Sequence, residues 1–127
     1  MQENNTSLAI GHFAEHAACE FLKKNGLQFL EKNFTHVDEN GVKRGEIDLI
    51  MRDKNYYVFI EVKRREKIDH GEPLECIDRR KQTNIIRTAT VFLLRNGLFN
   101  SAFCRFDVIG ILPGEITWIK DAFQVNY

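Results

Sequence analysis

The sequence predicts an α/β fold in which a mixed β-sheet is flanked by α-helices. Its 127 residues, 43% hydrophobic and 28% charged, fit one domain spanning residues 1–127. Two long segments repeat apolar residues at helical spacing, and five short apolar segments lie between turn signals. Because these elements follow the order helix, three strands, helix, two strands, we expect a mixed sheet with helices packed against it.

The first half of the chain is expected to form a helix and three strands. Apolar residues recur at helical spacing from Ile10 to Phe21, and the Asn-Gly pair at residues 40–41 marks a turn. The third strand is apolar on both faces, which is typical of a central strand. The expected elements are a helix from Thr6 or Ser7 to Gly26 and strands over residues 27–34, 46–51 and 56–63, the last two forming an antiparallel hairpin.

The second half is expected to add one helix and two strands after a polar connection. Ile85, Ala89 and Phe92 give the helix a buried stripe, and Asn96-Gly97 ends it. A Pro-Gly pair then separates the last two strands. The expected elements are a connection over residues 66–73, a helix over residues 74–95, and strands over residues 103–112 and 116–119.

Composition excludes several classes of protein. No apolar run approaches the roughly 20 residues that cross a bilayer, and the N-terminal residues lack the pattern of a secretory signal. An odd number of cysteines without a C-x-x-C pair is typical of a reducing compartment. We therefore expect a cytoplasmic protein with no membrane partner, in which the cysteines are small buried residues (Cys19, Cys76 and Cys104).

Charge is balanced overall but uneven along the chain. Eighteen Lys and Arg residues match eighteen Asp and Glu residues, so the chain lacks the net positive charge that is typical of a nucleic-acid-binding protein. Residues 63–87, however, carry eight basic residues against five acidic ones, beginning with Lys63, Arg64 and Arg65. A local basic segment is either a solvated surface or, beside acidic groups that hold a cation, a nucleic-acid contact.

Two charged residues interrupt the strand that is expected to be most buried. Alternation places Glu61 and Lys63 on one face of this strand. An ionised carboxylate without a partner costs several kcal/mol to bury, so the position needs an explanation. Glu46 and Asp48 share a face of the preceding strand, and the hairpin would set Asp48 opposite Glu61. Two facing carboxylates repel unless a proton or a cation lies between them.

A divalent cation is one solution to this repulsion. Asp48, Glu61 and a backbone carbonyl offer the oxygen ligands that Mg²⁺ prefers, and Mn²⁺ could substitute. Lys63 would then be placed to assist a metal-bound water or to stabilise phosphate charge, as in metal-assisted hydrolysis of a phosphodiester. The alternative is a buried salt bridge between Lys63 and one of the two carboxylates, without chemistry.

Polar residues at the start of the second helix bear on this choice. Lys81 and Gln82 lie four residues before Ile85 and Ile86, so they continue the buried stripe toward the sheet. Gln82 could contact a metal-bound water or a phosphate. The alternative is an exposed first turn with long side chains around the edge of the core. The residues expected to meet a nucleic-acid backbone are Lys81, Arg79 and Arg80, with Arg64 and Arg65 from the same basic segment.

The first helix adds one candidate acid and two histidines. Glu15 lies beside the apolar stripe among small alanines, so it could approach the same pocket closely. His12 and His16 have the i, i+4 spacing of zinc ligands, but no third ligand motif accompanies them. His36 and His70 fall in turn-like segments with no specific signal, although His70 could contact a substrate.

Several segments together carry a resemblance to a known family. The segments are Glu15, Gly45-Glu46-Ile47-Asp48-Leu49-Ile50, Phe59-Ile60-Glu61-Val62-Lys63, Lys81-Gln82 and Arg105-Phe106-Asp107-Val108. In this order they resemble the YraN-like family of bacterial proteins, in the PD-(D/E)xK nuclease superfamily beside archaeal Holliday-junction resolvases. The similarity spans about residues 11–123.

The resemblance implies a restriction-endonuclease-like core, Mg²⁺ as cofactor and DNA, including branched or junction DNA, as substrate. It assigns metal binding to Asp48 and Glu61, the catalytic amine to Lys63 and the polar group on the helix to Gln82. Glu15 becomes an accessory acid on the metal side. No small-molecule cofactor is implied.

Three functions therefore compete. The first is a metal-dependent deoxyribonuclease, an endonuclease or exonuclease acting in DNA repair or recombination, and a symmetric homodimer would enlarge its small DNA-binding surface. The second is a non-catalytic adaptor that binds DNA or protein and retains the nuclease fold. The third is a metal-free structural domain in which Lys63 pairs with Glu61.

Overall fold

The computed structural model has the element order that the sequence predicts. It describes residues 2–65 and 77–125, with side chains described from residue 11 onward. The elements are α1 (Gln2–Lys24), β1 (Gln28–Val37), β2 (Lys43–Asp53), β3 (Tyr56–Arg64), α2 (Arg79–Arg95), β4 (Phe103–Leu112) and β5 (Glu115–Phe123).

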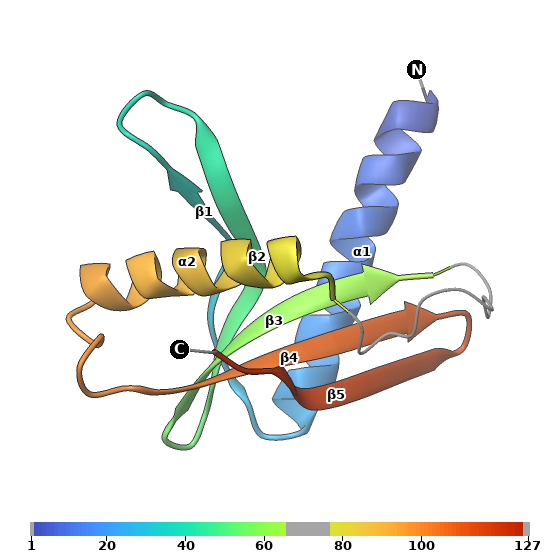
Figure 1. Cartoon of the computed structure of the whole chain (residues 1–127). Coiled ribbons are helices and arrows are strands. Elements are labelled where there is room, and N and C mark those ends of the chain that lie inside the picture. Colours follow the sequence, from blue (N-terminus) through green and yellow to red (C-terminus); the bar gives the residue numbers. More distant parts are fainter. Residues whose placement is uncertain (1, 66–76, 126–127) are drawn as a thin grey trace.

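The five strands form one mixed sheet in the order β1-β2-β3-β4-β5. β3 and β4 are parallel, and the other neighbouring pairs are antiparallel. The parallel pair requires a crossover, which contains α2, while short turns join the antiparallel pairs. α1 and α2 cover opposite faces of the sheet (Figure 1). The predicted α/β class, with a mixed sheet flanked by helices and a restriction-endonuclease-like order of elements, is therefore confirmed.

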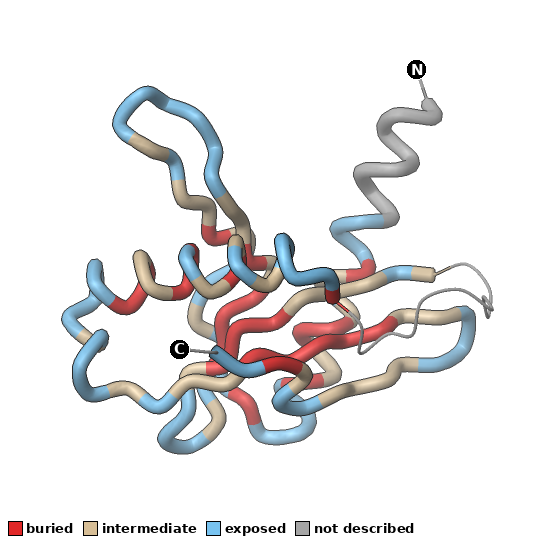
Figure 2. Tube along the Cα trace, viewed as in Figure 1, coloured by how far each residue is buried: buried red, intermediate tan, exposed pale blue. Residues whose placement is uncertain are grey.

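Each face of the sheet has its own apolar cluster. Beneath α2, the cluster joins Ile85 and Phe92 to Phe59 of the central strand β3. Beneath α1, a second cluster joins Leu22 to Ile60. β3 is therefore buried on both faces, as its apolar sequence predicts, and burial is concentrated along the middle of the sheet (Figure 2).

The ends of several elements differ from the sequence predictions. α1 begins at Gln2 rather than at Thr6 or Ser7, and β5 runs over Glu115–Phe123 rather than residues 116–119. The hairpin of β1 and β2 is also longer, because Asp38 Oδ1 accepts hydrogen bonds from the backbone N–H groups of Asn40 and Val42. This closed turn lets pairing extend to Val37 and Lys43.

The start of α2 is a correction with a clear physical cause. The helix begins at Arg79, with Asp78 as its N-cap, rather than at residue 74. The Asp78 side chain accepts a hydrogen bond of 2.8 Å from the backbone N–H of Lys81, which satisfies a donor that the first turn leaves unpaired. The predicted polar connection over residues 66–73 lies outside the described residues. The first turn of α2 therefore carries Lys81 and Gln82.

Gly45 fixes how closely α2 lies on β2. A Cβ atom at this position would overlap Oγ1 of Thr88 and lie 3.2 Å from the carbonyl oxygen of Asn84. Only glycine leaves this space for the helix backbone. The close approach places the N-terminal half of α2 next to the strand that carries Asp48.

β2 and β3 separate from one another at Asp48. Ile47 packs beneath α2, whereas Leu49 packs beneath α1, so the alternation of faces shifts at the residue between them. The register between β2 and β3 extends only to the pair Leu49 and Ile60. Beyond this point the hairpin of β1 and β2 projects away from β3 (Figure 1). A fork thus opens between Asp48 and the second half of β3.

A fully buried carboxylate, Asp107 on β4, lies one strand from this fork, where it pairs with Ile60 of β3. It has no exposed surface and accepts hydrogen bonds from Nε and Nη2 of Arg105, at 2.9 and 3.0 Å. Nε1 of Trp118 and the backbone N–H of Asp121 donate to it as well, each at 2.9 Å. Asp121 adopts a φ of 55°, and a bulge interrupts the pairing of β4 with β5 beside Asp107. Asp107 therefore secures an irregular strand pair.

Candidate metal centre

The fork between β2 and β3 brings the two predicted carboxyl groups together. Oδ2 of Asp48 accepts a hydrogen bond of 2.8 Å from the backbone N–H of Val62. This contact replaces the ladder pairing that ends at Leu49 and ties β3 to β2 through a side chain. Glu61 directly precedes Val62, and its carboxyl group is hydrogen-bonded to that of Asp48. The predicted pairing of these two residues across neighbouring strands is therefore present.

The carboxyl group of Asp48 is strongly biased toward its protonated form. Burial raises the pKa of Asp48 from its ordinary value of 3.8 to about 8, and the hydrogen bond to Glu61 and the negative charge of Glu61 add to the increase. The backbone N–H of Val62 acts in the opposite direction, and the charge of Glu15 raises the pKa further. Near neutral pH a proton thus relieves the repulsion within this acidic group.

Lys81, from the first turn of α2, contacts this acidic group. Its Nζ lies 2.8 Å from Oε2 of Glu61, whose side chain is 10% exposed, whereas the Lys81 side chain is 52% exposed. The hydrogen bond to Glu61 raises the pKa of Lys81, so the amine stays charged. The charge of Asp48 adds to that increase. The sequence predicts a contact of Lys81 with a nucleic-acid backbone, but its spacing does not indicate the ion pair with Glu61.

Gln82 and Lys63 lie on different elements beside the fork, Gln82 on α2 and Lys63 on β3. Nε2 of Gln82 donates a hydrogen bond of 2.7 Å to the carbonyl oxygen of Ile77, so this nitrogen is directed at the chain just before α2. Lys63 is half-buried and follows Glu61 by two residues, which places it on the same face of β3. The roles expected of both residues stay predictions.

Glu15 approaches the acidic pair from the other side of the sheet. It is half-buried on α1, between the buried residues Ala14 and Ala18. Its charge contributes to the raised pKa of Asp48, which brings the two residues into one electrostatic site. Glu46, by contrast, forms an ion pair with Lys43 on its own strand. The acidic groups that act on Asp48 are thus Glu61 and Glu15.

The remaining basic candidates lie on the surface near the fork. Arg64 is exposed at the end of β3, and Arg65, which is half-buried, follows it. Arg79 and Arg80 are exposed in the first turn of α2. The structure therefore groups the two basic segments around the ends of the elements that carry Glu61 and Lys81.

Neither the histidines nor the cysteines form a second metal site in the described part of the chain. Over residues 11–65 and 77–125, no three His, Cys, Asp or Glu side chains gather closely enough to hold an ion by themselves. Cys19 is buried, as predicted, whereas Cys104 is only half-buried. Burial raises the thiol pKa of both residues. Cys76 and His70 lie outside the described residues.

His36 is a polar residue whose environment the sequence did not indicate. Its Nδ1 is buried without a described hydrogen-bond partner. The residue lies opposite Gly45 in the pairing of β1 with β2, close to the point where α2 approaches the sheet. Its turn-like sequence context gave no sign of this position, because the strand extends three residues beyond the predicted end.

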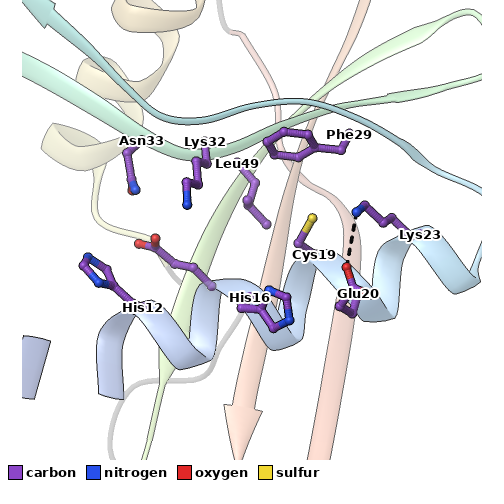
Figure 3. A pocket seen from close by; sticks show the side chains of 10 residues that line it. His12, His16, Cys19, Glu20, Lys23, Phe29, Lys32, Asn33 and Leu49 are labelled. Atoms are coloured by element: carbon purple, nitrogen blue, oxygen red, sulfur yellow. Dashed lines mark ion pairs between the residues drawn. The ribbon is translucent and has the colours of Figure 1, made fainter. Parts of the chain in front are cut away.

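A cavity of about 340 Å³ lies between α1 and β1, and Glu15 and Leu49 form part of its lining. Side chains of α1, including His12 and Cys19, face Lys32, Asn33 and Phe29 of β1 across it (Figure 3). The sequence indicates His12 and Glu15 as candidates but not the lining residues of β1. These strand residues come close to α1 only when the helix packs across β1.

The donor set suits a hard divalent cation. Mg²⁺ is commonly held by one or two carboxylates, with water and substrate phosphate as further ligands. Asp48 and Glu61 supply two carboxyl groups on adjoining strands. The proton that Asp48 retains near neutral pH reduces the repulsion between them, and a bound cation would replace that proton. The residues therefore fit such an ion, with Glu15 near enough to add negative charge.

Neither helix within the described residues is long and apolar enough to cross a membrane.

Comparison with known proteins places the chain in a family. Residues 14–111 match the model of the uncharacterised protein family UPF0102. A UPF0102 protein of Coxiella burnetii is 44% identical over 119 residues, which cover 93% of this chain and 94% of that protein. A UPF0102 protein of Clostridium botulinum is 40% identical over 122 residues, with coverage of 91% and 94%.

Among solved structures, the crystal structure of SSO0001 has a TM-score of 0.49 and 20% identity. That comparison covers 94% of this chain and 54% of the other. The family match and the curated relatives confirm the YraN-like resemblance on nearly the whole length of the sequence, and the chain belongs to the UPF0102 family, a member of the restriction-endonuclease-like superfamily.

Proposed function

We propose that this protein is a metal-dependent deoxyribonuclease that hydrolyses phosphodiester bonds in branched or junction DNA. The observation that carries the proposal is the hydrogen-bonded pair of Asp48 and Glu61 at the fork of the sheet, where Asp48 is mostly protonated near neutral pH. A fold seldom retains two facing acids in this state without a use for them, because an apolar pair would be cheaper to bury.

Asp48 and Glu61 are the residues that would hold Mg²⁺ or Mn²⁺. When bound, the ion neutralises phosphate charge and lowers the pKa of the attacking water. Hydrolysis joins the water oxygen to phosphorus and breaks a P–O bond, and the leaving oxygen takes up a proton. Lys63, on the face of β3 that carries Glu61, offsets the charge that develops on the phosphate.

The ion pair of Lys81 with Glu61 gives the helix a part in substrate binding. Lys81 is half-exposed and its stem is flexible, so its ammonium group can leave Glu61 for a DNA phosphate when a cation takes its place. Arg79, Arg80, Arg64 and Arg65 supply further positive charge beside it. We propose a symmetric dimer for binding two arms of a junction, since one chain offers little surface.

The test is cleavage of labelled junction, flap, nicked and circular DNA with Mg²⁺ or Mn²⁺. We expect cleavage that falls by about 100-fold or more in Asp48→Asn and in Lys63→Ala, as is typical when a catalytic group is removed. Lys120→Ala is the matched control, because Lys120 is exposed on β5 and stacks over Trp118 away from the fork. Cutting of the circular substrate would assign endonuclease rather than exonuclease action.

One observation favours a second candidate function, a DNA- or protein-binding adaptor. Lys81 already neutralises Glu61 in this structure, and such a pair can serve as a structural substitute for a cation. The adaptor predicts DNA binding without cleavage, unchanged by Asp48→Asn or Lys63→Ala. Cleavage that depends on both residues would exclude the adaptor.

A further inference from the structure

The cavity between α1 and β1 has a size and a lining that suit a nucleotide. Its volume of about 340 Å³ lies within the range of roughly 300–1,000 Å³ that is typical of small-ligand sites. Phe29, a residue that is 37% exposed, contributes its ring. Lys32, Asn33 and His12 contribute polar groups that converge on the same space (Figure 3). An aromatic face beside hydrogen-bond donors matches a base joined to a phosphate.

Positive charge gathers on one side of this cavity. Lys23 lies over the Phe29 ring at 5.8 Å from its centre and forms an ion pair of 3.2 Å with Glu20. Lys32 extends from the opposite strand, and both lysines act electrostatically on Cys19 at the cavity wall. A phosphate entering between them would meet two ammonium groups, and a base could stack on the Phe29 ring.

The cavity shares two lining residues with the surroundings of the candidate metal centre. Leu49, which directly follows Asp48, forms part of its lining, and Glu15 lines it as well. Glu15 is also one of the residues whose charge acts on Asp48. A strand with one nucleotide in the cavity would therefore place a neighbouring phosphodiester beside Asp48.

We infer that this cavity receives an unpaired nucleotide of the DNA substrate, so that the protein prefers duplexes that carry a single-stranded tail or flap over fully paired ends. The inference rests on the proposed function for its ligand. The cavity would let the protein select DNA with an unpaired base, which Phe29 and Lys32 would hold. Neither the acidic pair nor the basic residues at the fork provide such selection.

A binding experiment without catalysis tests this inference. Fluorescence anisotropy in EDTA would compare a blunt duplex with the same duplex carrying an unpaired tail. We expect wild-type protein to bind the tailed duplex at least five-fold more tightly, and Phe29→Ala or Lys32→Ala to bring this ratio close to one. Phe103→Ala is the matched control, because this exposed phenylalanine on β4 lies outside the cavity lining and its loss should leave the ratio unchanged.

Each outcome separates the inference from the proposed function. A tail preference that persists in Phe29→Ala and Lys32→Ala would overturn the inference even if the protein cleaves DNA. A preference that these variants abolish would support it even if no cleavage occurs. Competition by free thymidine monophosphate at the same affinity as the tail would also overturn it, since the cavity would then recognise a mononucleotide rather than a DNA strand. Circular dichroism of each variant establishes that it is folded.

Discussion

Asp48, which is half-buried, and Asp107, which is fully buried, lie on neighbouring parts of one sheet, yet their surroundings are opposite. Asp107 accepts hydrogen bonds from Arg105, Trp118 and the backbone of Asp121. Asp48 is hydrogen-bonded to the backbone N–H of Val62 and to the side chain of Glu61, and the negative charge of Glu15 acts on it as well. Donors stabilise a carboxylate, whereas acids destabilise it.

The difference distinguishes a structural carboxylate from a candidate functional one. Around Asp107, every described partner donates a hydrogen bond and so lowers the free-energy cost of burying a charge. These hydrogen bonds also hold the bulge between β4 and β5 in place. Around Asp48, burial and its neighbours raise the pKa to about 8, a cost that the fold alone does not explain. Burial of an acid is thus a weak indicator of function until its partners are known.

Removing the structural carboxylate should have the largest effect on stability. Asp107→Ala leaves the Arg105 guanidinium and the Trp118 N–H without their acceptor, so we expect a loss of about 3–5 kcal/mol in the free energy of unfolding. Urea denaturation measures this loss. Asp53→Ala is the control, because Asp53 contacts the same Arg105 at 3.2 Å but is 22% exposed. A loss for Asp107→Ala no greater than for Asp53→Ala would contradict the structural assignment.

Stability should depend on pH through Asp48, with a smaller effect. Below about pH 4 the carboxyl group is protonated in the folded and the unfolded chain. As the pH rises toward about 8, only the unfolded chain loses this proton, so the free energy of unfolding falls. We expect a fall on the order of 2 kcal/mol, since part of the shift belongs to the Asp48–Glu61 pair.

Asp48→Asn provides the comparison for this pH dependence. The amide keeps the shape of the side chain and does not titrate, so the variant should show a flatter profile and match or exceed wild-type stability near pH 8. Denaturation curves at several pH values between 4 and 8 would show both effects. Equal pH profiles for wild type and variant would mean that Asp48 is not the group whose pKa is raised.

Replacing Lys81 should have the smallest effect on stability and an informative effect on binding. Because the Lys81 side chain is 52% exposed, Lys81→Met should change the free energy of unfolding by less than about 1 kcal/mol. If Lys81 competes with a cation for Glu61, the variant should bind Mn²⁺ more tightly and DNA more weakly. Calorimetry and anisotropy measure the two affinities. Unchanged affinity for both ligands would remove Lys81 from the site.

Much of the fold is predictable because it depends on local patterns. The alternating and continuous apolar runs indicated β3 as a central strand, and the stripe containing Ile85 and Phe92 indicated the buried face of α2. The N-cap at Asp78 carries a recognisable signal, an aspartate before a helical pattern, but the helix was predicted to begin earlier. The extensions of β1 and β2 depend on the Asp38 turn, whose side-chain hydrogen bonds a strand pattern does not report.

The site was predictable only in part, for a physical reason. The alternation of side chains along a strand, together with the hairpin turn, predicts that Asp48 and Glu61 lie opposite one another. The shift of faces at Asp48, the contact of Lys81 with Glu61 and the cavity beside Glu15 depend on how two helices are laid across opposite faces. These are tertiary relations between residues far apart in the chain, and no local spacing contains them.

The most direct test of the central claim is isothermal titration calorimetry with Mn²⁺ at pH 7, in buffers of different ionisation enthalpy. Since Asp48 retains a proton near this pH, binding of a cation by Asp48 and Glu61 should release close to one proton per ion. We predict this release for wild-type protein and the loss of binding in Asp48→Asn. Absence of Mn²⁺ binding by wild-type protein, or equal binding by the variant, would contradict the account.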